Sequence, residues 1–157
     1  ANFIALPTTF VNPSIITPGI ASEMAVPALK EAFAQVNGPI VMHSGGTPLT
    51  THLDLLAGLP NVAGIVLNHK DNLAGARESV GPDLTLLGNV EGLNLSQRAP
   101  EKIRAECEEV LRDRRDDPHF LLSSSTGDIG LDTPPDQIHA FRQAAEEWGN
   151  GQGGSTP

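Results

Sequence analysis

The chain has 157 residues, enough for one domain with a sizeable hydrophobic core. Its formal net charge is −9 and it contains no basic run, which argues against a nucleic-acid-binding protein. A single cysteine excludes an internal disulfide framework, and no apolar run approaches the roughly 20 residues of a membrane-spanning helix. These features predict a cytoplasmic α/β protein that contacts neither nucleic acid nor a membrane.

The chain begins with a short apolar run, a long loop and an amphipathic helix. Residues 3–6 predict a strand that Pro7 ends, and a polar, proline-containing loop follows over residues 8–19. Loops of this length are often functional, although a plain surface connection fits about as well. A helix reaching to about residue 37 is indicated by an apolar face made of Val26, Leu29, Phe33 and Val36.

The alternation of strands and helices then continues along the chain. Further strands are predicted over residues 39–42, 62–67, 84–87 and 120–122. The remaining helices are indicated by four apolar sets: Leu49, Leu53 and Leu56; Leu73, Ala76 and Val80; Ile103, Cys107, Val110 and Leu111; Ile138, Phe141, Ala145 and Trp148. Residues 149–157 are rich in Gly, Ser and Pro, so we expect a disordered tail after a domain of residues 1–148.

Five strand–helix units of roughly 30 residues each predict an α/β fold with a parallel sheet and right-handed crossovers. Two architectures fit this pattern, an open doubly wound sheet and part of a (β/α)8 barrel. No Gly-rich phosphate-binding fingerprint follows the first strand, which argues against a doubly wound sheet of the dinucleotide-binding type. The first and last strands lack edge-protecting charges, so we expect a homodimer or a part of a longer chain.

Polar residues follow the predicted strands, at the strand ends where α/β proteins bind ligands. The turn after residues 84–87 carries Asn89 and Glu91. We predict that His43 and Asp128 are catalytic, either as a proton relay or as one nitrogen and one oxygen ligand. The predicted substrate-binding residues are Asn68, Asn89, Glu91 and Ser124.

Each of these positions also has a purely structural interpretation. His43 fits a hydrogen-bonded structural histidine, Asn89 fits a residue that satisfies loop backbone groups, and Asp128 fits a turn or helix cap. His69 and Lys70 follow the third strand, but side chains at such positions are more often solvated. Cys107 falls on the apolar stripe of its helix, which favours a buried packing role.

Four motifs, taken together and in order, resemble the uroporphyrinogen decarboxylase superfamily. They are Asn-Pro-Ser-Ile-Ile at 12–16, Val-Met-His-Ser-Gly-Gly at 41–46, Leu-Leu-Gly-Asn-Val-Glu at 86–91 and Asp-Thr-Pro-Pro-Asp-Gln-Ile at 132–138. The resemblance covers residues 3–148. It implies a (β/α)8 barrel, of which this chain would form the C-terminal half with strands four to eight.

The superfamily divides into decarboxylases and methyltransferases linked to cobalamin or coenzyme M. Many of the methyltransferases bind zinc through a His-x-Cys pair and a further cysteine after the last strand. His43 matches the histidine, but Gly45 and Gly127 stand at the two cysteine positions. In decarboxylases the position of Gly127 holds a histidine, and their catalytic aspartate and arginines lie in the other half of the barrel. The resemblance therefore implies no zinc site, and a likeness to the methyltransferase-related branch.

Two classes of function follow from the resemblance. The first is part of a corrinoid-dependent methyltransferase-like enzyme that acts on a tetrapyrrole or a small methyl donor. In that case the chain alone binds no cofactor, and a corrinoid (cobalamin) reaches the site on a partner protein. The second is a non-catalytic binding or partner module, or an excised fragment of a tetrapyrrole decarboxylase.

Overall fold

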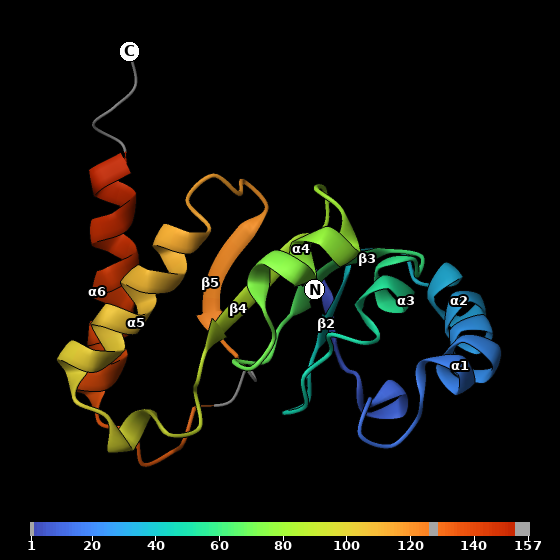
Figure 1. Cartoon of the computed structure of the whole chain (residues 1–157), viewed down its shortest axis with the longest axis horizontal. Helices are drawn as coiled ribbons and strands as arrows, with labels where there is room; N and C mark the ends of the chain where they lie inside the picture. Colours follow the sequence, from blue (N-terminus) through green and yellow to red (C-terminus); the bar gives the residue numbers. More distant parts are fainter. Residues whose placement is uncertain (1, 126–128, 153–157) are drawn as a thin grey trace.

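Five parallel strands form a single sheet whose order follows the chain. The computed structural model describes residues 2–125 and 129–152 (Figure 1). The strands are β1 (Ile4–Pro7), β2 (Ile40–His43), β3 (Val62–Val66), β4 (Thr85–Val90) and β5 (Phe120–Ser124), paired in the order β1-β2-β3-β4-β5. Because all pairs are parallel, the five C-terminal strand ends lie at the same edge of the sheet.

The connections between strands are helical, as predicted. A continuous helical segment over 18–34 consists of α1 (Pro18–Ile20), a π-turn η2 (Ala21–Ala25) and α2 (Val26–Ala34). It is preceded by the 3-10 turn η1 (Thr9–Val11). The later helical elements are α3 (Leu53–Ala57), α4 (Leu73–Val80), the 3-10 turn η3 (Leu95–Gln97), α5 (Pro100–Asp113) and α6 (Pro135–Gln152). None of the helices in the described part of the chain is long and apolar enough to cross a membrane.

Local sequence signals explain where several helices begin and end. The Asn72 side chain accepts a hydrogen bond from the Gly75 amide at 2.7 Å and caps the start of α4. Gly81 ends this helix with a φ of 79°, a left-handed conformation that glycine adopts without a steric penalty. Pro100 occupies the first turn of α5, where its missing amide proton costs nothing.

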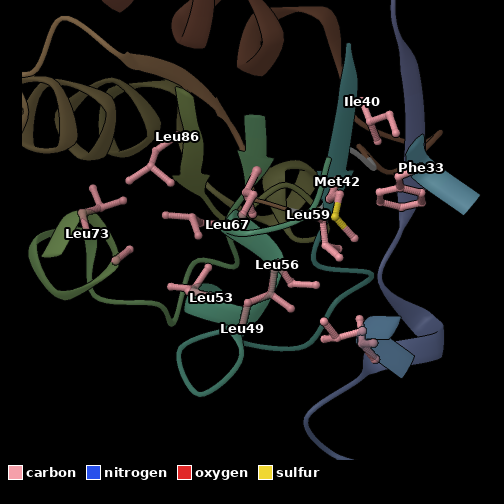
Figure 2. Packing of buried hydrophobic residues seen from close by; sticks show 14 residues of the cluster. Phe33, Ile40, Met42, Leu49, Leu53, Leu56, Leu59, Leu67, Leu73 and Leu86 are labelled. Atoms are coloured by element: carbon pink, nitrogen blue, oxygen red, sulfur yellow. The ribbon is translucent and has the colours of Figure 1, made fainter. Parts of the chain in front are cut away.

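The main hydrophobic core lies between one face of the sheet and the helices that follow β1 to β3. Ile40, Met42, Ile65 and Leu86 of the strands are fully buried. They pack against Phe33, Leu49, Leu53, Leu56, Leu59 and Leu73 of the helices and loops (Figure 2). Burying one such side chain contributes roughly 1.5–3 kcal/mol. A second, smaller cluster joins β4, α5 and α6 through Val90, Leu95, Ile103, Cys107 and Ala144.

The opposite face of the sheet is open. Alternate residues such as Val41 and Leu87 are only half-buried, and Leu121 is 55% exposed. This face is hollow, with a volume of about 620 Å³, and its lining includes Ala5, Val41, His43, Gly64, Leu87 and Leu121. A doubly wound sheet reverses its strand order and carries helices on both faces, so that alternative is wrong. The chain forms five consecutive units of a (β/α)8 barrel, with its inner face uncovered.

The C-terminal helix differs from the sequence-based prediction in two respects. Its buried residues are Ala140 and Ala144, whereas Ile138 is 42% exposed and Ala145 is also exposed. The buried face is turned because α6 packs mainly against α5, beside which it lies in Figure 1. The helix also continues to Gln152, four residues into the predicted tail, because an established helix adds further residues more easily than it starts. The rest of that tail, residues 153–157, lies outside the described residues.

Candidate functional site

The loops that follow β2 and β5 meet at the C-terminal edge of the sheet. The Ser44 hydroxyl donates a hydrogen bond of 3.2 Å to the Ser125 carbonyl, which is 81 residues further along the chain. The Ser125 amide donates to the Val90 carbonyl at 2.7 Å, and both serines are almost completely buried. Since β3 and β4 lie between these strands, the contact requires the sheet to curve as it does in a barrel. The edge is therefore a concave mouth.

His43 is the last residue of β2 and lines the open inner face beside this mouth. Its carbonyl accepts a hydrogen bond of 2.9 Å from the Thr8 amide, which joins β2 to the loop after β1. Its ring Nδ1 is buried and has no hydrogen-bond partner among the described residues. A buried polar atom without a partner costs free energy, so this nitrogen is available to a ligand. Its predicted partner Asp128 lies outside the described residues.

Asn68 and Asn89 both use their side chains to hold the loop after β3. The Asn89 amide donates to the carbonyls of Asn68 and Asp71, at 3.1 and 2.9 Å. The Asn68 side-chain oxygen accepts a hydrogen bond of 3.0 Å from the Lys70 amide within the same turn. These contacts agree with the structural interpretation that the sequence left open for Asn89. The substrate-binding role assigned to the two asparagines stays a prediction.

Asp71 organises this region, although the sequence analysis did not single it out. Its buried carboxylate accepts hydrogen bonds from the amides of Leu49, Thr50 and Asn68 and from the Thr50 hydroxyl, at distances from 2.6 to 3.1 Å. It therefore joins the loop after β2 to the loop after β3. The available signal was a carboxylate three residues beyond Asn68 in a strand-to-helix turn, a setting in which aspartate commonly bonds backbone amides.

His69 lies closer to the other polar groups of the mouth than its sequence position suggested. Its Nδ1 is 3.4 Å from the Ser125 hydroxyl, and its Nε2 is 3.8 Å from the Glu91 carboxylate. The same Glu91 oxygen accepts a hydrogen bond of 2.8 Å from the Asn94 amide. Three loops, those after β3, β4 and β5, thus contribute to one polar cluster. The sequence prediction selected Glu91 and Ser124, whereas it set His69 aside as solvated and did not select Ser125.

Residues 1–148 match the sequence profile of the family described as uroporphyrinogen decarboxylase (URO-D). The chain belongs to this family. Among solved structures, a methyltransferase from Methanosarcina mazei is similar to it, with a TM-score of 0.79 and 24% sequence identity. The match covers 94% of this chain and 42% of the Methanosarcina chain, so this chain spans less than half of that protein. At this identity the likeness shows the fold, and it confirms the partial barrel. None of the curated proteins matches the sequence.

The donor set at the mouth does not fit the thiolate zinc site that many methyltransferases of the superfamily have. Within residues 2–125 and 129–152, no three His, Cys, Asp or Glu side chains lie close enough to share a metal ion. Gly45 lies two residues after His43, at the position of the zinc-binding cysteine. It has a φ of 59° and no side chain that could bind a metal. The one thiol, Cys107, is buried in the cluster between α5 and α6. A tetrahedral zinc site needs at least three protein ligands, so no chemical step is assigned to zinc here.

Proposed function

We propose that this chain is the C-terminal barrel half of a methyl-transfer enzyme that binds its substrate over the C-terminal ends of β2 to β5. The observation that carries the proposal is the gathering of His43, Ser44, His69, Glu91 and Ser125 at this edge. In (β/α)8 barrels the active site lies at this end of the strands. The proposed site is therefore where the fold concentrates its polar groups.

Two observations favour methyl transfer over decarboxylation. The similar solved structure is that of a methyltransferase. In addition, Gly127 stands where the decarboxylases of the family have a histidine.

The side chains of the mouth have separate roles in this proposal. His43 contributes its Nδ1, which is buried and bonds no group in the described part of the chain, to substrate binding at the inner face. Glu91, Asn68, Asn89 and Ser124 are retained as substrate-binding candidates, and Asp128 as the catalytic partner of His43. When present, a corrinoid on a partner protein supplies the methyl-carrying centre. The residues of this chain position the substrate, shield it from water and exchange its proton.

The experiment compares two reactions of the native, full-length gene product. One assay follows the absorbance change of a reduced corrinoid on methylation, with a panel of methylated ethers, amines and thiols. The other measures carboxyl loss from uroporphyrinogen. We expect methyl transfer that falls at least tenfold in His43→Ala, with His119→Ala at the opposite end of the strands as the matched control. Decarboxylation without methyl transfer would refute the proposal.

A second candidate function is a non-catalytic binding module. It is favoured by Gly45, whose left-handed backbone conformation disfavours the cysteine that a zinc-dependent relative would need there. Under this alternative, the full-length protein binds a methylated compound or a tetrapyrrole at the mouth, and His43→Ala weakens binding. Neither methyl transfer nor decarboxylation would then be detected with any substrate in the panel.

A further inference from the structure

His69 lies between two polar partners from different loops, an arrangement that the proposed function does not by itself require. Its ring Nδ1 is 3.4 Å from Ser125 Oγ, and its Nε2 is 3.8 Å from Glu91 Oε1. The ring follows β3, whereas its partners follow β4 and β5. One imidazole therefore has a hydroxyl on one side and a carboxylate on the other.

The two partners are themselves held in place. Ser125 is completely buried, donates its amide proton to Val90 and accepts a hydrogen bond from Ser44 at its carbonyl. Glu91 accepts from the Asn94 side chain, and its carbonyl accepts from the Arg98 guanidinium. The orientation of the His69 ring is thus set by groups that have little freedom of their own. Such support is what a proton-transferring side chain needs for a defined geometry.

His69 and Glu91 remain accessible from the mouth, with side chains 29% and 30% exposed. Ser125 is not accessible, so it cannot attack a substrate as a nucleophile. The distance of 3.8 Å between His69 Nε2 and Glu91 Oε1 is too long for a hydrogen bond, so a third atom can approach this nitrogen. Catalytic contacts are commonly this long before substrate binds.

We propose that His69 Nε2 is the proton acceptor of this site, that Glu91 stabilises the protonated ring and that Ser125 is a positioning residue. In the neutral ring the proton sits on Nδ1 and is donated to Ser125 Oγ, which keeps the Nε2 lone pair facing the mouth. This inference rests on the proposed function for methyl transfer, and it concerns the methyl acceptor. That acceptor is a compound whose reacting oxygen, nitrogen or sulfur carries a hydrogen, such as an alcohol, an amine or a thiol.

The step balances without any further reactant. The heteroatom of the substrate forms a bond to the methyl carbon of a methyl donor, and the bond between that carbon and the donor breaks. The bonding electron pair stays with the donor. The hydrogen of the heteroatom moves as a proton to His69 Nε2, and Glu91 faces the imidazolium that results. Removal of this proton by a positioned base accelerates such reactions by about 10²- to 10⁴-fold.

The first test does not depend on activity. Long-range proton–nitrogen NMR spectra of the full chain, labelled at histidine, report which ring nitrogen carries the proton in neutral His69. His69→Gln assigns the signal. We expect the Nδ1–H form in the native protein and a change to the Nε2–H form, the one that free histidine prefers, in Ser125→Ala. Ser44→Ala is the matched control, because it removes the other side-chain contact at Ser125 and leaves its hydroxyl in place. An Nε2–H ring in the native protein, or no change in Ser125→Ala, overturns the inference.

The second test measures turnover of the full-length protein in the direction in which the proton is lost, from a methylated corrinoid to an alcohol, an amine or a thiol as methyl acceptor. His69→Gln should lower kcat by about 100-fold or more with little change in KM, since the ring acts in the chemical step. Added imidazole should restore part of the turnover of His69→Gly. Ser125→Ala should lower kcat by a smaller factor than His69→Gln, because the imidazole base is still present but less well oriented. A native kcat in His69→Gln refutes the inference. If the native protein transfers no methyl group, the proposed function fails, and the NMR result still decides whether the ring is arranged as an acceptor.

Discussion

Arg77 and Asp117 form a bidentate ion pair across the N-terminal ends of β4 and β5, with Nε–Oδ2 and Nη2–Oδ1 distances of 2.9 and 3.0 Å. The same guanidinium donates to the carbonyls of Gly81, Leu84 and His119 at 2.7 to 3.1 Å. Both side chains are mostly buried, at 17% and 12% exposed. One arginine therefore joins the end of α4 to the starts of two strands, at the edge opposite the proposed site.

Replacing this arginine should destabilise the protein clearly. Arg77→Lys keeps the positive charge, but an ammonium group cannot form the bidentate pair with Asp117 and also donate to the three backbone carbonyls. We therefore expect the unfolding free energy to fall by about 2–3 kcal/mol. Urea denaturation monitored by circular dichroism provides the measurement. Arg142→Lys is the control, because the exposed pair of Arg142 and Glu146 should contribute less than about 0.5 kcal/mol. Equal effects of the two substitutions would contradict the role given to Arg77.

His52 makes stability depend on pH. Burial lowers its pKa below the ordinary 6.5, and the Ile16 carbonyl and the Asp54 carboxylate oppose this only in part. Between the lowered pKa and 6.5 the unfolded chain binds more protons than the folded chain, so acid favours unfolding. The stability from neutral His52 is complete above about pH 6.5 and is lost as the pH falls below that value. Urea midpoints from pH 8 to pH 5 should fall less in His52→Gln than in the native protein. If the urea midpoint depends on pH equally in His52→Gln and in the native protein, His52 is not the cause of that dependence.

Cys107 should be unreactive while the protein is folded. Its side chain is completely buried, and this burial, with a smaller effect of Glu106, raises the pKa of the thiol to about 12. Because the thiolate is the reactive form, almost none is present at neutral pH. We expect a disulfide reagent such as Ellman's to label the thiol only after denaturation. Rapid stoichiometric labelling of protein that keeps its native circular dichroism would contradict the packing described for α5 and α6.

The mouth should not hold zinc tightly. The His43 Nδ1 has no hydrogen-bond partner among residues 2–125 and 129–152, but Gly45 supplies no thiolate beside it. We expect zinc well below one equivalent after dialysis against a weak chelator, measured by atomic emission. One equivalent of retained zinc that disappears in His43→Ala would show that other residues complete a metal site.

The open inner face should be covered in solution. Leu121 is 55% exposed on this face, and β1 and β5 each have an unpaired edge within the sheet. We propose that a second copy, or the other half of a longer polypeptide, covers the exposed surface. Sedimentation of the 157-residue chain at low micromolar concentration should therefore give a dimer, and Leu121→Glu should weaken it. A monomer with a sharp cooperative melting transition would refute this.

The spacing of apolar residues predicted much of the fold. The sequence predicted less of the candidate site. The runs around Ile40, Ile65 and Leu86 predicted strands because a parallel strand of a barrel, which is covered on both faces, is apolar without interruption. The buried face of α6 was misjudged because spacing alone does not tell whether a helix packs against a sheet or against another helix. Asn89 was predicted to lie in the turn after its strand, but it lies within β4, and its side-chain amide bonds the neighbouring loop, which follows only from tertiary contacts. His69 was interpreted as solvated for the same reason, since its two partners are distant in sequence.

The division of the hydrophobic core into two clusters bears on the order in which the chain acquires structure during synthesis. All the fully buried residues of the larger cluster lie between Val11 and Leu86. Those of the smaller one lie between Val90 and Ala144. On the ribosome, β1 to β4 can therefore pack against their helices before α5 and α6 have been translated. Only Val110 and Phe120, which lie at the border of the larger cluster, are added to it later. The nascent chain would then expose the edge of β4 until β5 emerges and pairs with it, and an unpaired strand edge can pair with the wrong partner.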